Sequence, residues 1–218
     1  MITTVIIVIT VLISLRAFSD DALMSRFIFN PPRVERGEWH RLFTYGLVHA
    51  DFAHLIFNMF TFYLFGTEVE RVCKMALGET VGAITFVALY STAILVSIIP
   101  TYRKHKNNTM YYGLGASGAV CAVIFAYVLV NPMNFMGILF IPIMLPAFLF
   151  GIVFLLISLS LDKQQAGGIN HSAHIWGGVY GILFMTVIFW AFIDVNLLQT
   201  FVAQIQVNSL SDIIHIGF

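Results

Sequence analysis

The longest run without a charged residue, from Asn107 to Leu161, constrains the fold of this chain more than any other feature. One transmembrane helix needs roughly 20 apolar residues, so this run is long enough to enter or cross a bilayer more than once. The composition agrees, because 59% of the 218 residues are hydrophobic and 10% are charged, against about 45–50% and about 25% in soluble domains. The sequence therefore predicts a polytopic membrane protein.

Charged and turn-forming residues divide the chain into six hydrophobic segments. They cover about 1–18, 52–67, 80–100, 113–131, 146–161 and 171–193. We expect an all-α membrane protein, a bundle of six transmembrane helices, with one core over residues 1–194 and a short tail over 195–218. The third segment is predicted to stop at Pro100, and Pro142 and Pro146 indicate a loop along the membrane before the fifth.

Three further features limit the classes of protein that fit. No Lys or Arg precedes the first segment, so we expect a retained span rather than a signal peptide. The formal net charge is zero, which gives no reason to expect a nucleic-acid partner. Cys73 and Cys121 lie in apolar surroundings, so free thiols are expected rather than a disulfide.

Polar residues recur near the starts of the second, fourth and sixth segments. They are His54, Asn58, Ser117, His171 and His174. Consecutive spans alternate in direction, so these three helices run the same way. At 1.5 Å per residue the polar residues share one depth, roughly 5–10 Å below one surface. Because such side chains are costly in hydrocarbon and usually face a bundle interior, this layer is the predicted functional site.

The residue types in this layer limit its chemistry. The six segments contain no Asp or Glu, and the chain has no HExxH motif. A buried Ser-His-Asp triad, a pair of catalytic aspartates and a zinc site of that type are therefore disfavoured. A serine activated by a histidine remains.

Ser117 lies in the sequence Gly113-Leu114-Gly115-Ala116-Ser117-Gly118. The glycines allow a sharp turn into a helix, whose first N–H groups and dipole favour a developing oxyanion. The other interpretation is that these small residues only pack, and Gly118, Ala122 and Ala126 do form a small-residue stripe. Packing and catalysis are compatible at this position.

His174 lies on one helical face with Gly177 and Gly181, which would let the sixth helix approach the fourth closely. A general base must come within hydrogen-bonding reach of its nucleophile, and this approach would permit that. The alternative is a core histidine bonded to a backbone carbonyl.

His54 and Asn58 are four residues apart and share one face of the second helix. Their N–H groups are suited to an oxyanion, although both residues also serve as hydrogen-bonding links between membrane helices. His49 either braces the preceding loop or has no role, and His171 is interpreted as a structural residue at the mouth of the site.

Five short motifs follow one another along the chain. They are Gly37-Glu38-Trp39-His40-Arg41, His49-xxxx-His54-xxx-Asn58, Gly115-Ala116-Ser117-Gly118, Phe140-Ile141-Pro142 and Ala173-His174-xx-Gly177-xxx-Gly181. With these motifs the chain resembles the rhomboid family of intramembrane serine proteases from about residue 25 to residue 190. Each motif is weak alone, and the specificity comes from finding all of them in order on the expected segments.

The resemblance implies a catalytic dyad of Ser117 and His174, with His54, Asn58 and the Ser117 backbone N–H binding the oxyanion. It implies that the enzyme uses neither a metal nor a nucleotide. Arg41 would belong to a structured external loop that is partly embedded in the membrane.

The resemblance also implies that the fifth segment and the loop Asp162–Asn170 form a substrate gate and cap, with Gly167-Gly168 supplying flexibility. The expected partners are the lipid bilayer and single-span membrane proteins, cut in or near their transmembrane segments. The compact core suggests a prokaryotic plasma membrane, with the site open to the extracytoplasmic side. The Lys and Arg residues of the loops by themselves favour the reverse orientation.

Two other functions stay open at this point. A rhomboid-fold protein that binds membrane clients without cutting them would use the same bundle. A metal- or haem-binding membrane protein would use His49, His54, His171 and His174 as ligands. The sequence does not indicate the oligomeric state.

Overall fold

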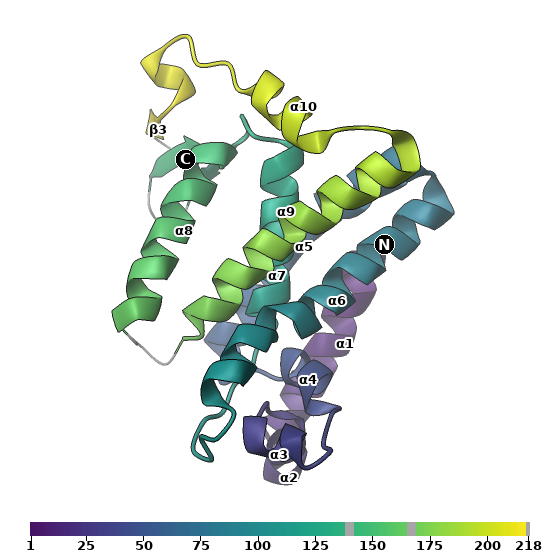
Figure 1. The fold of residues 1–218 in the computed structure, drawn as a ribbon, viewed down its shortest axis with the longest axis vertical. Helices are drawn as coiled ribbons and strands as arrows, with labels where there is room; N and C mark the ends of the chain where they lie inside the picture. The colour runs from purple at the N-terminus through teal and green to yellow at the C-terminus, as the bar shows by residue number, and fades with distance from the viewer. Residues whose placement is uncertain (138–141, 165–168, 217–218) are drawn as a thin grey trace.

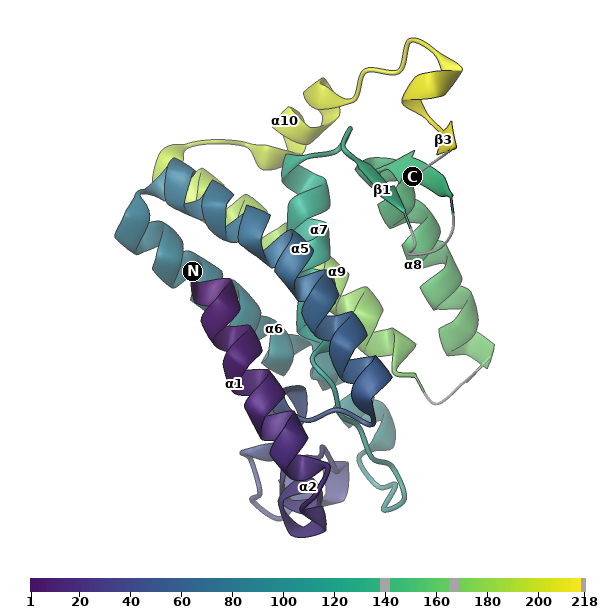
Figure 2. The same ribbon diagram turned by 180° about the vertical axis from the view of Figure 1, so that it is seen from behind.

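The computed structural model describes residues 1–137, 142–164 and 169–216. Six long helices form the bundle: α1 (Ile2–Ala17), α5 (Phe52–Leu77), α6 (Glu79–His105), α7 (Ser117–Val130), α8 (Ala147–Gln164) and α9 (His171–Ile193). Each corresponds to one predicted hydrophobic segment, which confirms the helical membrane bundle. Figures 1 and 2 show α7 inside the bundle, and it contacts α5, α6 and α9.

The lengths and composition of the helices suit a membrane. Helices α6, α8 and α9 are each long and apolar enough to cross one, and α1 and α7 are shorter apolar helices. At 1.5 Å per residue the 14 residues of α7 extend about 21 Å, less than the ~30 Å hydrocarbon layer. A helix of this length does not by itself reach across the hydrocarbon layer.

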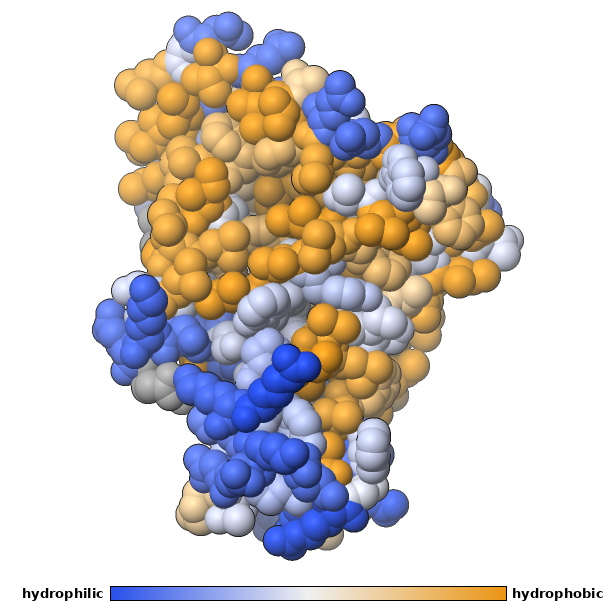
Figure 3. Space-filling view, in the orientation of Figure 1, coloured by the Kyte–Doolittle hydropathy of each residue, from blue (hydrophilic) through white to orange (hydrophobic). Residues whose placement is uncertain are grey.

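The outer surface of the bundle is apolar. Leu156 of α8 and Trp190 of α9 are 61% and 65% exposed, and many other large hydrophobic side chains are exposed as well. Figure 3 shows hydrophobic surface over most of the upper part of the molecule, with hydrophilic residues gathered at the lower end and a smaller number at the top and upper right. Such a surface is suited to lipid, since a soluble monomer rarely exposes so large an apolar patch.

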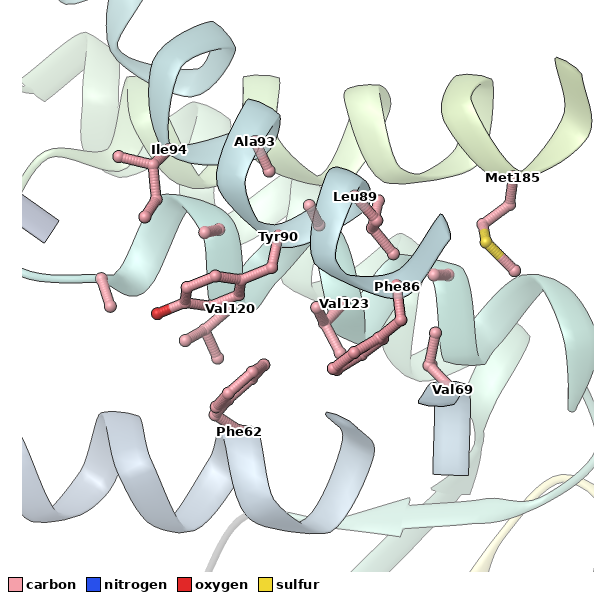
Figure 4. Packing of buried hydrophobic residues seen from close by; sticks show 14 of the residues in the cluster. Phe62, Val69, Phe86, Leu89, Tyr90, Ala93, Ile94, Val120, Val123 and Met185 are labelled. Atoms are coloured by element: carbon pink, nitrogen blue, oxygen red, sulfur yellow. The ribbon is translucent and has the colours of Figure 1, made fainter. Parts of the chain in front are cut away.

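The core between α5, α6 and α7 is built on aromatic rings. Phe62 packs against Phe86 and Tyr90, with ring centroids 6.1 Å and 4.5 Å away, inside the usual range for aromatic pairs. Figure 4 shows these rings beside Val123 of α7, with Met185 of α9 close by. This packing fixes the positions of the helices that carry the polar layer.

Helix α5 is longer than predicted, because the carboxylate of Glu70 is satisfied within the bundle. Glu70 is 2% exposed, and its carboxylate accepts hydrogen bonds from the backbone N–H groups of Ile2 and Thr3 at 3.0 and 2.9 Å. It also pairs with Lys74 at 3.0 Å. The carboxylate thus caps the N-terminus of α1, far from the polar layer, and α5 ends only before Gly78.

The prediction that the third segment stops at Pro100 is wrong, because α6 continues to His105. A proline inside a helix removes one backbone hydrogen bond, and here tertiary contacts hold the last turns. Lys106, directly after the helix, pairs with Glu35 at 3.2 Å, and the Thr101 hydroxyl donates to Asn170 at 3.0 Å.

The connection between α1 and α5 is structured. It contains α2 (Asp21–Phe27), α3 (Pro31–Glu35), α4 (Arg41–Thr44) and the short 3₁₀ helix η1 (Tyr45–Leu47). Arg41 is 1% exposed and donates from one nitrogen to the carbonyls of Ser25 and Ile28, both at 2.7 Å. Its other contact is Glu38, and this hydrogen bond lowers the pKa of the Glu38 carboxyl. Arg41 therefore holds the loop together from inside.

A small antiparallel sheet, which the sequence did not predict, lies at the other end of the molecule. It consists of β1 (Phe135–Gly137), β2 (Ile143–Pro146) and β3 (His215–Ile216), in that order. In its register Phe135 lies opposite Pro146, and Ile143 lies opposite Ile216. The chain between α9 and β3 includes α10 (Leu197–Gln204) and the 3₁₀ helix η2 (Leu210–Asp212).

The sheet contains much of the stretch where the two prolines predicted a loop, and β2 leads directly into α8. Phe140 and Ile141 of the predicted motif, and the Gly167-Gly168 pair of the predicted cap, lie outside the described residues.

Candidate active site

The structure brings Ser117 and His174 into contact. Ser117 is the first residue of α7, and His174 lies in the first turn of α9. The Oγ of Ser117 is 2.8 Å from the Nε2 of His174, although 57 residues separate them in the chain. Both side chains are half-buried, and the distance is that of a hydrogen bond.

The close approach of α7 and α9 depends on glycine. A Cβ added to Gly177 would lie 2.0 Å from the carbonyl oxygen of Gly118, and one added to Gly181 would lie 2.1 Å from that of Ala122. Both distances are far inside van der Waals contact, so the two backbones touch here. This confirms the predicted role of Gly177 and Gly181 and explains how Ser117 and His174 come within reach.

The start of α9 is fixed by a residue that the sequence reasoning missed. The side-chain oxygen of Asn170 accepts a hydrogen bond from the Ala173 N–H at 3.1 Å and another from the Thr101 hydroxyl at 3.0 Å. These bonds cap α9 and link it to α6, which fixes the position of His174 relative to α6. Asn directly before an apolar helix is a common N-cap and was the available signal.

The turn before Ser117 requires glycine at residue 115. Gly115 has a φ of +106°, and a Cβ there would lie 2.6 Å from the Cε1 of His54. Its N–H donates to the carbonyl of Tyr45 at 2.9 Å. The loop is thus pressed against α5 and η1, and His54 lies directly beside the turn that leads to Ser117.

His49 braces the same turn from the other side. Its Nε2 accepts a hydrogen bond from the Ala116 N–H at 3.4 Å, so its proton is on Nδ1, which donates to the Ser14 hydroxyl at 3.0 Å. That hydroxyl in turn donates to the carbonyl of Leu47 at 2.9 Å. His49 is fully buried, and the structure therefore favours the bracing interpretation.

His54 and Asn58 are on the face of α5 that lies toward the site. Asn58 is 7% exposed, and its side-chain amide donates one N–H to the carbonyl of His54 at 3.1 Å. An amide group has two N–H bonds, so this contact leaves one for another acceptor.

The four histidines form two pairs rather than one cluster. The rings of His49 and His54 are 5.0 Å apart, and those of His171 and His174 are 5.8 Å apart. Within the described ranges, no group of three or more metal-ligating side chains is close enough to hold an ion. This arrangement does not support the alternative in which all four histidines bind one metal ion.

The structure is thus a bundle of apolar helices in which a serine and a histidine are in contact at the starts of α7 and α9. The family comparison is more particular, since the model of the rhomboid domain matches residues 36–191. The chain belongs to the rhomboid family.

Curated relatives agree with this assignment. The rhomboid protease GlpG of Haemophilus influenzae is 27% identical over 201 residues, which are 90% of this chain and 91% of the relative. RHOMBOID-like protein 12, a mitochondrial protein of Arabidopsis thaliana, is 28% identical over 173 residues, or 74% and 50% of the two chains. The putative rhomboid protease YdcA of Bacillus subtilis is 34% identical over 94 residues, or 43% and 42%. This chain thus matches half or less of the length of the last two relatives.

Proposed function

We propose that this chain is an intramembrane serine endopeptidase that hydrolyses peptide bonds in or near the transmembrane segments of other membrane proteins. Ser117 is the nucleophile and His174 is the general base. The observation that carries the proposal is the 2.8 Å contact between Ser117 Oγ and His174 Nε2. A serine hydroxyl is a weak nucleophile, and an adjacent base in hydrogen-bonding reach is what activates it.

In the first half of the reaction, Ser117 Oγ attacks the scissile carbonyl carbon while its proton passes to Nε2 of His174. The tetrahedral intermediate collapses when the histidine gives that proton to the leaving amine, which departs with the C-terminal part of the substrate. The acyl group is then bonded to Ser117. In the second half, His174 takes a proton from water, the resulting nucleophile attacks the ester, and Ser117 regains its proton.

The negative oxygen of the intermediate forms beside the start of α7. The first N–H groups of a helix have no partner within the helix, and the helix dipole favours negative charge there. The Ser117 N–H is one such group, and His54 and Asn58 complete the set of donors. Removing one such donor from an oxyanion site typically costs about 10²–10³-fold in rate.

The substrate is expected to be a single-span membrane protein with a segment that unwinds. The carbonyl groups of an intact helix are hydrogen-bonded and surrounded by side chains, so only unwound backbone can reach Ser117. The catalytic core is proposed to be residues 1–194, in a prokaryotic plasma membrane with the site facing the extracytoplasmic side.

A fluorophosphonate probe tests the proposal, because it reacts with activated serines. We expect labelling of the wild-type protein in lipid and its loss in both Ser117→Ala and His174→Ala. Ser91→Ala and His215→Ala are matched controls and should label normally, since Ser91 bonds to its own helix and His215 lies in β3. Absence of labelling in folded wild-type protein would favour the alternative, a client-binding protein without protease activity.

A further inference from the structure

His174 is packed between aromatic rings from two different helices. One is His171 in its own helix, at 5.8 Å between ring centroids and an interplanar angle of 83°. The other is Phe154 of α8, at 6.3 Å and 32°. Both distances fall within the range of favourable aromatic contacts.

Hydrogen bonding alone leaves the orientation of the His174 imidazole incompletely fixed. Among the described residues, its side-chain hydrogen bond is the one to Ser117. A histidine held by a single hydrogen bond can still rotate about its side-chain torsions. In many hydrolases a carboxylate on the second nitrogen prevents this rotation, whereas the neighbours of His174 shown here are rings.

We propose that Phe154 is a positioning residue, whose ring holds the His174 imidazole in the orientation that presents Nε2 to Ser117. Phe154 is itself supported from α7 and α8, by Phe125 at 6.0 Å and Phe150 at 6.5 Å. The three phenylalanine rings therefore form a continuous contact from the bundle interior to the base. The catalytic consequence of this inference rests on the proposed protease function.

Helix α8 is the element whose movement would undo this contact. Three of its residues are buried, Ala147, Gly151 and Ser158, and most of the others face outward. Its first turn is anchored, because the Ala147 N–H donates to Asn134 at 2.8 Å and the Phe148 N–H donates to Pro132 at 3.0 Å. Phe154 lies about two turns beyond this anchor. If α8 tilts away from α9, the Phe154 ring leaves His174. The position of α8 therefore affects whether Nε2 of His174 is oriented toward Ser117.

The alternative, that Phe154 only blocks access to the site, predicts the opposite change in the labelling rate. If the ring only blocked entry to the site, Phe154→Ala would open it and speed up the reaction of Ser117 with a small probe. If the ring positions His174, the same variant slows that reaction by about two- to tenfold, the value of one aromatic contact. The initial rate of fluorophosphonate labelling in nanodiscs separates the two, because so small a probe does not require docking of a substrate helix.

Two further variants distinguish the effect of the aromatic ring from the effect of side-chain volume. Phe154→Tyr keeps the ring and should label at nearly the wild-type rate, whereas Phe154→Leu keeps the bulk and should be slow. Leu156→Ala, at a lipid-facing position of the same helix, is the matched control and should be unchanged. In cleavage assays the loss in Phe154→Ala should appear in kcat, with KM little altered. Faster labelling of Phe154→Ala, or equal labelling of the Tyr and Leu variants, would overturn the proposal.

A spectroscopic measurement tests the positioning role without reference to activity. Nitrogen-15 spectra of histidine-labelled protein report whether His174 Nε2 is hydrogen-bonded to Ser117, with Ser117→Ala as the reference for the broken bond. We expect the bonded signal to weaken in Phe154→Ala and to persist in Phe154→Tyr. If wild type is never labelled by the probe but this pattern appears, the protease function fails and the positioning role stands. A bonded signal unaffected by Phe154→Ala refutes the positioning role.

Discussion

The contact between α7 and α9 makes Gly177→Ala the most informative single substitution. The new Cβ would lie 2.0 Å from the Gly118 carbonyl oxygen, and real Cβ atoms essentially never come closer than 3.0 Å to a neighbour. The two backbones must therefore separate by about 1 Å, and backbone cannot rotate out of the way as a side chain does. Overpacking of this kind typically costs ~1–3 kcal/mol, partly offset by the ~1 kcal/mol that alanine gains over glycine in a helix.

The effect on the site should exceed the effect on stability. A 1 Å separation takes Ser117 Oγ and His174 Nε2 from 2.8 Å to beyond hydrogen-bonding distance, and a misplacement of that size can cost about 10²-fold in rate. We therefore expect Gly177→Ala to fold, to lose up to about 2 kcal/mol of unfolding free energy, and to label with the fluorophosphonate about 10²-fold more slowly.

The matched control is Gly82→Ala, near the start of α6. Its Cβ would lie 2.4 Å from the carbonyl oxygen of Cys73 in α5, so it also meets backbone, but in a helix contact that includes neither Ser117 nor His174. This variant should lose stability as Gly177→Ala does and keep its labelling rate. If Gly177→Ala labels as fast as Gly82→Ala, glycine packing between α7 and α9 does not set the geometry of the site, and the reasoning is wrong.

Three further predictions concern other parts of the bundle. Glu70→Gln should lower the thermal midpoint and reduce the unfolding free energy by about 1–3 kcal/mol, because the charged cap of α1 is weakened. Glu68→Gln, on the exposed side of the same helix, should change both little. His49→Phe should slow fluorophosphonate labelling, because the ring shape remains while the hydrogen bonds to Ala116 and Ser14 are lost; an unchanged rate would contradict the bracing role. In intact cells, Asn107→Cys should react with a membrane-impermeant maleimide and Ser209→Cys should not, because the proposed orientation places residue 107 outside; the reverse pattern would follow the positive-inside rule instead.

The sequence by itself determined the bundle and the layer of polar residues. Segment length and apolar composition are local properties, and they were enough to locate all six long helices. The spacing of His54 and Asn58, and that of His174, Gly177 and Gly181, are also local, because residues four apart on a helix share a face. Alternating direction of consecutive spans then placed Ser117 and His174 at one depth, without knowledge of their contact distance.

Only the tertiary structure decided which groups hold this layer in place. Ser14 and His49 are 35 residues apart, Thr101 and Asn170 are 69 apart, and the Thr3 contact to Glu70 spans 67. Sequence patterns cannot pair such residues, because each partner satisfies the other's hydrogen bonds only after the helices have packed. The same reason explains the helix ends: a buried carboxylate and a proline predicted termination locally, yet contacts with distant segments stabilised the longer helices. The contact of the Phe154 ring with His174 was also decided only by the tertiary structure, since α8 acquires its position from the packing of the bundle.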